Sequence, residues 1–383
     1  MIKSINKSVV LFVILFITYL PLFNYYSVLN KNNGHSFMTA DWLINYNFGY
    51  VNRGLFGTIL INLFSNSKNM LNFLTIVLIL IYLLIFYFLC KTFQSNKQNF
   101  ISYVLIFSPT TFLFNIYDSQ GAFRKEILGI LVVFIISSIN TQKRIRLLYF
   151  GSLVYTLAIF SHPVNLFFIS TILYLLFFHL KTRKINHYLI YIIPVLFNFI
   201  FHFLFSGSEQ ELVQKRNGMC EQLSMLELSN LCGFGSFDFL VYDLNANYLI
   251  TQDYIINQNR EASYVYIFLF IISLIPYFFE KNLSRFIAPM IIIGITFFPL
   301  FLLGYDWGRW IYMISICFLT IYLVSNKKAV NSSLIYILTL FPILFKIEHC
   351  CSPILEISIY SLNENFLYLF TNFSNIFKII SIN

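Results

Sequence analysis

Apolar stretches as long as a membrane-spanning helix recur along the whole chain. A transmembrane α-helix needs roughly 20 apolar residues to cross the hydrocarbon core of a bilayer. Only 11% of the 383 residues are charged, whereas soluble domains carry about 25%. The sequence therefore predicts an all-α polytopic membrane protein and excludes a soluble enzyme, a disordered chain and a disulfide scaffold. The clearest candidate spans are residues 9–29, 70–90, 101–117, 126–140, 147–161, 164–180, 188–206, 263–279, 286–304, 311–325 and 332–348.

Three further features complete the predicted membrane topology. An amphipathic segment at 366–380 is a possible twelfth span, so the expected total is about 11–12 transmembrane helices. The apolar piece at 55–64 is too short to span, which favours an interfacial helix or a re-entrant turn. The first span resembles a signal peptide but lacks a small-x-small cleavage site, so we interpret it as a retained membrane anchor.

Charge is distributed unevenly between the two sets of connections. One set holds 14 of the 25 basic residues and a single acid, Glu280, whereas the other 15 of the 16 acids lie in or beside the opposite set. Positively charged loops stay cytoplasmic. This asymmetry predicts a cytoplasmic N-terminus and places the acidic connections outside.

The longest outward connection, 207–262, is predicted to form a loop subdomain within a single membrane domain of residues 1–383. It contains Cys220 and Cys232, and an oxidising compartment permits a disulfide between them. Cys350 and Cys351 are also predicted to face outward. We take Cys220–Cys232 as the first candidate pair, although connectivity does not follow from sequence alone.

Three arginines lie on the outer side, against the positive-inside rule. Each has an aspartate nearby in sequence, giving the pairs Arg53 with Asp41, Arg124 with Asp118, and Arg309 with Asp306. Each pair taken alone is typical of a helix cap or of snorkelling at the headgroups. Three pairs on one side favour an outer site for an anionic substrate if the helix ends converge, because ionisable groups at membrane depth are functional candidates. Arginine suits phosphate since its planar fork donates two parallel hydrogen bonds.

Two other residue types accompany these charges. His162 begins the sixth span, where it serves either as a polar contact between helices or as a base or donor to a phosphate oxygen. Aromatic residues such as Trp307 fit sugar stacking and equally fit an interfacial aromatic belt. The remaining histidines have no ligand-like spacing, so we assign no metal.

Several motifs are absent from the sequence. It contains no Walker A loop, no Gly-rich dinucleotide fingerprint, no H-E-x-x-H and no G-x-S-x-G. No nucleotide cofactor or intramembrane-protease site is therefore predicted. A basic groove with interleaved aromatic residues, of the kind that binds nucleic acid, is not recognisable either.

Two regions resemble known families. Residues 123–128, Phe-Arg-Lys-Glu-Ile-Leu, followed by 158–164, Ala-Ile-Phe-Ser-His-Pro-Val, resemble the EpsG/Wzy group of polysaccharide polymerases, in which an Arg opens one span and a His opens a later one. The chain differs from that group in having Lys125 where Gln is usual. More broadly, Asp41 after the first span, with an outer amphipathic helix behind it, is similar to GT-C membrane glycosyltransferases.

The resemblance implies a GT-C-like fold with a large periplasmic loop and a location in the bacterial inner membrane. It implies that a polyprenyl-pyrophosphate-linked glycan is transferred to the terminal hydroxyl of a new lipid-linked repeat unit on the outer face. The expected partners are that lipid-linked oligosaccharide, membrane lipid and a chain-length regulator protein, without cofactor or nucleic acid. The implied catalytic residues are Asp41, Asp118 and His162, and the implied binding residues are Arg53, Arg124, Asp306, Arg309 and Trp307.

Other functions remain open from the sequence. A GT-C transferase that uses a single polyprenyl-phosphate sugar needs the same groups. A lipid-linked oligosaccharide flippase needs charged groups through the centres of its spans and openings to both sides, whereas the charge here is concentrated outside. A purely structural scaffold does not account for arginines placed against the topology.

Overall fold

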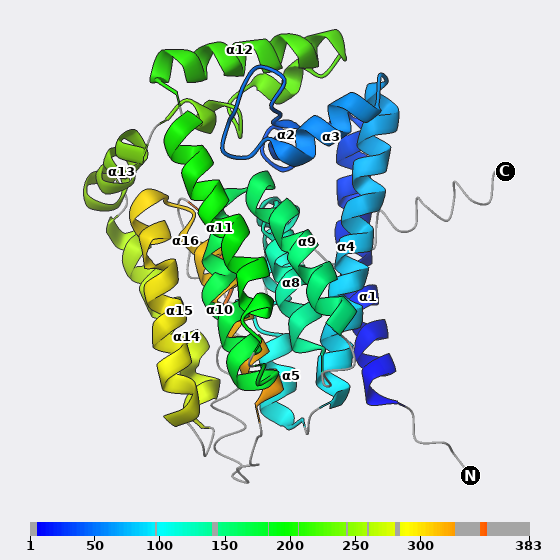
Figure 1. The fold of residues 1–383 in the computed structure, drawn as a ribbon, viewed down its shortest axis with the longest axis vertical. Helices are drawn as coiled ribbons and strands as arrows, with labels where there is room; N and C mark the ends of the chain where they lie inside the picture. Colours follow the sequence, from blue (N-terminus) through cyan, green and yellow to red (C-terminus); the bar gives the residue numbers. More distant parts are fainter. Residues whose placement is uncertain are drawn as a thin grey trace, which may run out of the picture.

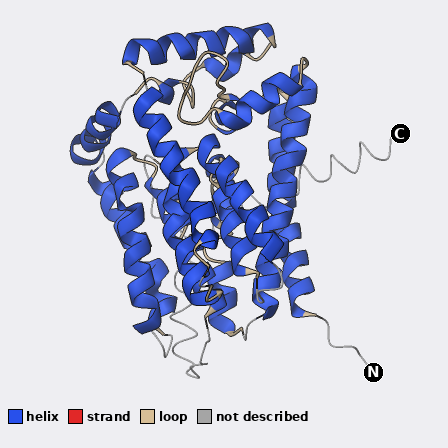
Figure 2. Cartoon of the chain, viewed as in Figure 1, coloured by secondary structure: helices blue, strands red, loops and turns tan. Residues whose placement is uncertain are grey.

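The protein is a bundle of α-helices with one helix, α12 (Glu209–Met225), lying across one end (Figures 1 and 2). The secondary structure within the described ranges is helical and includes no β-strand. The computed structural model describes residues 6–95, 98–139, 145–182, 184–205, 207–242, 244–258, 260–279, 284–325 and 345–350.

Six of the described helices are long and apolar enough to cross a membrane, which makes this a multi-pass membrane protein. Three shorter apolar helical segments lie beside them: α8 (Ile127–Ser137), α9 (Ile145–Ser161) and the continuous stretch Pro163–His179. That stretch comprises η2 (Pro163–Phe168), α10 (Ile169–Tyr174) and η3 (Leu175–His179). The six long helices are α1 (Lys7–Lys31), α4 (Ser67–Ser95), α11 (Asn186–Phe205), α14 (Arg260–Phe278), α15 (Ser284–Leu303) and α16 (Trp307–Val324).

One predicted span was wrong as a continuous helix. Residues 101–117 divide into α5 (Phe100–Ile106) and α6 (Phe114–Tyr117), joined by a turn. Pro109 disfavours helix at the residue before it, and the Thr111 hydroxyl donates to the Leu105 carbonyl at 2.6 Å. The predicted span at 332–348 lies outside the described residues except for 345–348, and the segment 366–380 lies wholly outside them.

Helix α16 is the central helix of the bundle. It is buried along almost its whole length and contacts α15, α8, α5, α14 and α4, as expected for a helix that is apolar all round. The same core extends between α1 and α4, where the rings of Tyr19 and Phe86 are 4.9 Å apart in an edge-to-face arrangement. The Tyr19 hydroxyl donates to the Phe112 carbonyl at 2.7 Å, which satisfies its buried oxygen.

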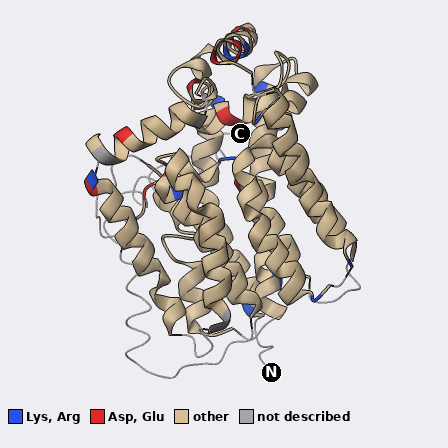
Figure 3. Cartoon of the chain, turned by 60° about the vertical axis from the view of Figure 1, so that its left-hand side comes forward, with Lys and Arg blue, Asp and Glu red and all other residues tan. Residues whose placement is uncertain are grey.

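The two ends of the bundle differ in charge. Within the part of the chain coloured in Figure 3, the acidic residues lie toward the end that α12 covers, and basic residues alone mark the opposite end. The short helices α2 (Met38–Leu43) and α3 (Leu55–Leu63) also lie at the α12 end (Figure 1). The predicted segment 55–64 is therefore a separate short helix.

Two cross-links hold the α12 region together. The predicted disulfide between Cys220 and Cys232 is confirmed, with Cα atoms 5.7 Å apart, and it ties η4 (Ser229–Cys232) to α12. Arg216 of α12 pairs with Asp238, the first residue of η5 (Asp238–Leu240), at 2.5 Å. The chain then continues through α13 (Leu244–Asp253) and η6 (Tyr254–Gln258) into α14.

Labelling of single cysteines tests the orientation of the bundle. We expect a membrane-impermeant thiol reagent to label Gln210→Cys in intact cells and to label Lys184→Cys only after the membrane is opened, because basic connections stay cytoplasmic. Both positions are exposed. The native Cys90 and Cys317 are buried and serve as the unlabelled background. Labelling of Lys184→Cys alone in intact cells would reverse the orientation.

Candidate functional site

Asp41 lies fully buried in α2, at the α12 end of the bundle. Trp42, the next residue of α2, holds the helix in place, because its indole N–H donates to the Phe123 carbonyl at 2.6 Å. An Arg53 guanidinium nitrogen is 3.7 Å from one Asp41 oxygen. Neither oxygen of Asp41 accepts a hydrogen bond from a described residue. A buried carboxylate without such bonds is costly, so this arrangement points to a site that takes a further donor.

Gly57 allows the loop that carries Arg53 to approach α2. A side-chain carbon at position 57 would overlap the backbone carbonyl of Ile44, which follows α2 directly. The close approach of α3 to the end of α2 brings Arg53 back beside Asp41. The pairing predicted from their proximity in sequence is therefore present in the fold.

Lys125 joins this pair from the start of α8. Its side chain is fully buried, and its ammonium donates to the Arg53 carbonyl at 2.7 Å. Burial lowers the pKa of Lys125 to about 7, although the negative charge of Asp41 acts to raise it. Burial acts to raise the pKa of Asp41, but Lys125, Arg124 and Arg53 outweigh it and hold that pKa below its usual range. Asp41 therefore stays ionised as the counter-ion of what we call the cationic cluster, Arg53, Arg124 and Lys125.

His162 lies between α9 and η2 and caps η2. Its Nδ1 accepts the Val164 backbone N–H at 3.2 Å, so the neutral ring carries its hydrogen on Nε2. Burial lowers the pKa of His162 to about 3. The imidazole is therefore a neutral hydrogen-bond donor. With Nδ1 occupied, it lacks a free lone pair for the role of base.

Arg309 lies at the start of α16 and is held by two carboxylates, Glu126 and Asp306. The predicted proximity of Arg309 to Asp306 is thus present, and Glu126 is an additional partner from a distant part of the chain. Trp307, the first residue of α16, is held by its indole N–H, which donates to the Phe301 carbonyl at 3.1 Å. Its role in binding sugar stays a prediction.

The predicted pairing of Asp118 with Arg124 was wrong. One Asp118 oxygen caps α7 (Ser119–Ala122) by accepting the Gly121 N–H at 3.1 Å. The other accepts both the backbone N–H and the ring Nδ1 of His349. Both oxygens of Asp118 already accept hydrogen bonds, so the carboxylate positions the start of α7 and the His349 ring.

Arg124 has no carboxylate partner among the described residues. Its side chain is buried, one terminal nitrogen is 3.5 Å from the Ser236 hydroxyl, and its Nε has no hydrogen-bond partner. The guanidinium carbon lies 5.8 Å from the centre of the Phe37 ring. Three cations of the cluster share the single carboxylate of Asp41, and Arg124 has no described carboxylate in direct contact, so its guanidinium is suited to bind an anion.

The predicted site residues converge in part. Asp41, Arg53, Arg124 and His162 form one electrostatic group, and the field of this group extends to Arg309. Sequence reasoning missed His349 and the burial of Lys125. Lys125 could have been found because, like its neighbour Arg124, it is a cation against the positive-inside rule. His349 carried no comparable signal.

One group of side chains has the composition of a metal site. Asp306, His349 and Cys350 bring potential ligand atoms within 4.8 Å of one another. Cys350 is disulfide-bonded, however, and offers no thiolate. Two ligands remain in this group, and we assign no metal to it.

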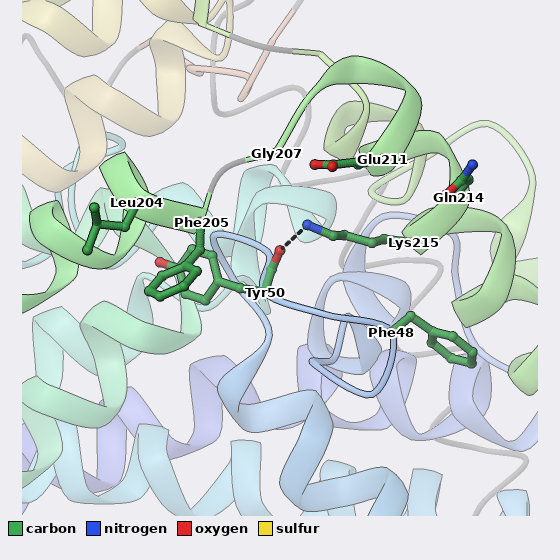
Figure 4. A pocket seen from close by; sticks show the side chains of 8 residues that line it. All are labelled: Phe48, Tyr50, Leu204, Phe205, Gly207, Glu211, Gln214 and Lys215. Carbon is green, nitrogen blue, oxygen red and sulfur yellow. Dashed lines mark hydrogen bonds between the residues drawn. The ribbon is translucent and has the colours of Figure 1, made fainter.

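A cavity of about 590 Å³ lies between the end of α11, α12 and the loop before α3 (Figure 4). The Lys215 ammonium donates to the Tyr50 carbonyl at 3.1 Å across it. Tyr50 also contacts helix α11. The centre of its ring lies 6.0 Å from that of Phe201 and 6.3 Å from that of Phe205. The same short loop therefore lines an aromatic cavity at Tyr50 and carries the cationic cluster residue Arg53.

Comparisons of this chain with protein-family models, curated proteins and solved structures found no match. No relative therefore contributes a substrate or a residue role. The chemistry of the buried charges and their surroundings is the basis for a functional conclusion.

Proposed function

We propose that the chain is a membrane glycosyltransferase, and specifically a polymerase of lipid-linked surface-polysaccharide repeat units at the outer face of the bacterial inner membrane. The observation that carries this proposal is Arg124. It is a buried arginine without a described carboxylate partner, within a cationic cluster at one end of the bundle. Its planar fork suits the pyrophosphate of a polyprenyl-linked glycan.

The proposed reaction uses this charge directly. The oxygen of an acceptor hydroxyl forms a bond to the anomeric carbon of the donor glycan, while the bond from that carbon to the pyrophosphate oxygen breaks. The bonding electrons leave with the pyrophosphate. Arg124, assisted by Arg53, stabilises the charge that develops on the leaving group, where preorganised donors have their largest effect.

Asp41 and His162 suit the positioning of hydroxyl groups. Asp41 has two buried oxygens without hydrogen-bond donors among the described residues, so it can accept hydrogen bonds from sugar hydroxyls. His162 presents an N–H, because its other ring nitrogen is occupied by Val164. The two residues therefore offer an acceptor and a donor to a sugar bound beside the cationic cluster.

The aromatic cavity supports a lipid-linked substrate. Its lining combines the aromatic rings of Phe48, Tyr50 and Phe205 with polar residues of α12, among them Lys215. It adjoins the exposed apolar end of α11. A polyprenyl chain reaching it from the bilayer is led by the loop of residues 50–53 toward Arg53. The GT-C-like architecture and the periplasmic location of α12 belong to this proposal.

The distribution of charge favours transfer over flipping. The clustered ionisable groups lie toward one end of the bundle (Figure 3), whereas a flippase requires polar groups through its centre and access to both sides. Transfer of a single sugar from a polyprenyl phosphate uses the same cluster and differs in its product.

Reconstitution in lipid vesicles tests the proposal. Purified protein is mixed with a polyprenyl-pyrophosphate-linked repeat unit, without nucleotide sugar. We expect products two or more repeat units long together with released polyprenyl pyrophosphate. Addition of one sugar from a polyprenyl-phosphate donor would replace the polymerase with the single-sugar transferase. Movement of the lipid across the bilayer without covalent change would support a flippase and reject both.

A further inference from the structure

Residues 345–350 are packed against the start of α16. The Gly308 N–H donates to the His349 carbonyl at 3.1 Å, and the Tyr266 hydroxyl donates to the Glu348 carbonyl at 3.3 Å. A side-chain carbon at Gly308 would overlap the Glu348 carbonyl, so only glycine permits this approach. His349 is thereby fixed beside Asp118, 231 residues away in sequence.

The Asp118 carboxylate sets the tautomer of His349. Its oxygen is 2.6 Å from the His349 Nδ1, and an ionised carboxylate only accepts hydrogen bonds. Nδ1 therefore carries the hydrogen, and Nε2 keeps its lone pair. Asp118 is itself held by the Gly121 N–H at 3.1 Å. A histidine oriented in this way by a carboxylate is suited to proton transfer.

Other candidate bases at the site are less suitable. The cations around Asp41 hold its pKa below the usual range, which makes it a weak base. The Lys125 ammonium donates to the Arg53 carbonyl, and Nδ1 of His162 is occupied by Val164. The His349 side chain is 24% exposed, in contrast, which leaves room for a substrate hydroxyl. The pKa of His35 is lowered by burial and also by the charges of Arg124 and His349. Arg124 and His349 therefore lie in the same region of the protein.

We propose that His349 is the general base of the transfer reaction and that Asp118 is its positioning residue. This inference rests on the proposed function. Nε2 of His349 takes the proton of the acceptor hydroxyl as the oxygen bonds to the anomeric carbon, and the bond to pyrophosphate breaks. The proton ends on the imidazolium, whose charge the Asp118 carboxylate stabilises, and later passes to water.

The test compares three variants in the vesicle transfer assay. His349→Gln is expected to lower the turnover rate about 100-fold or more, as is typical when a general base is removed. Asp118→Asn reverses the preferred tautomer and is expected to lower turnover about as strongly. Glu348→Gln is the matched control: it lies on the same segment and pairs with Lys346, and we expect it to keep wild-type turnover.

Two readouts separate a base from a structural residue. The wild-type rate is expected to fall at acid pH, as for any reaction that needs an unprotonated base, and this decline should disappear in His349→Gln, which has no basic nitrogen. Free imidazole is expected to restore turnover to His349→Gly, and it should not restore Asp118→Asn. The charged and titratable side chains in the surroundings of His349 are Asp118, Asp306, His35, Arg124, Glu348 and Lys346.

The outcomes distinguish the two proposals. Failure of the wild type to transfer any sugar would reject the proposed function and, with it, the role of His349. Wild-type transfer accompanied by normal turnover in His349→Gln would reject the base alone. Polyprenyl-pyrophosphate binding by each variant shows whether its site has folded. Loss of both binding and turnover in His349→Gln would make His349 a structural residue and reject the base.

Discussion

Replacing Arg309 with methionine is expected to destabilise the protein by about 3–5 kcal/mol, because it leaves the partner carboxylate Glu126 charged and unpaired in the interior. The two side chains are only 4% and 5% exposed. The measurement is the thermal unfolding of the purified protein in detergent. The double variant Arg309→Met/Glu126→Gln is expected to recover a large part of the loss, since no unpaired charge then remains at position 126.

Arg216 provides the control for this experiment. Its ion pair with Asp238 is about a quarter exposed on both sides, and such pairs contribute about 0–1 kcal/mol. Arg216→Ala should therefore change unfolding little. An Arg309→Met variant as stable as Arg216→Ala would show that the pair with Glu126 does not support the start of α16.

Replacing Arg124 with lysine is expected to lower transfer about 100-fold or more, nearly as much as replacement with alanine. Removal of a single preorganised donor to a developing charge has an effect of this size. Lysine keeps the positive charge but loses the planar fork that binds two phosphate oxygens. The measurement is turnover in the vesicle assay, with Arg216→Lys as a matched arginine at the same end of the bundle that should be nearly silent.

Features set by local sequence were predictable. The lengths of the apolar runs predicted α1 and α4, and the shortness of the run at 55–64 separated α3 from the spans. The pairing of Arg53 with Asp41 follows from their separation by only 12 residues and from the loop between α2 and α3, which carries Arg53. The Cys220–Cys232 bond was favoured because both residues share one connection.

Features set by tertiary packing were not predictable. The bond of Asp118 to His349 and the pair of Glu126 with Arg309 each join segments far apart in the chain, and no periodicity marks such partners. Asp118 was assigned to Arg124 because the two are neighbours in sequence, but the N-cap of α7 turns the carboxylate toward His349. The break in 101–117 depends on one proline and one threonine within an otherwise apolar run.

The role of His162 also depended on the structure. Sequence allowed a base, a donor or a packing contact, because all three place a histidine at a helix start. The backbone N–H of Val164 uses the Nδ1 lone pair, which leaves the donor role. Burial gives the same answer, since it lowers the pKa of His162 to about 3.

Binding of polyprenyl pyrophosphate to the purified protein tests the central claim most directly, because it reports on Arg124 without requiring turnover. A titration compares the wild type, Arg124→Lys and Arg216→Lys in nanodiscs of neutral lipid. We predict that the wild type and Arg216→Lys bind equally well, and that Arg124→Lys binds at least tenfold more weakly, a difference of about 1.4 kcal/mol. Equal affinity in all three proteins would contradict a phosphate site at Arg124.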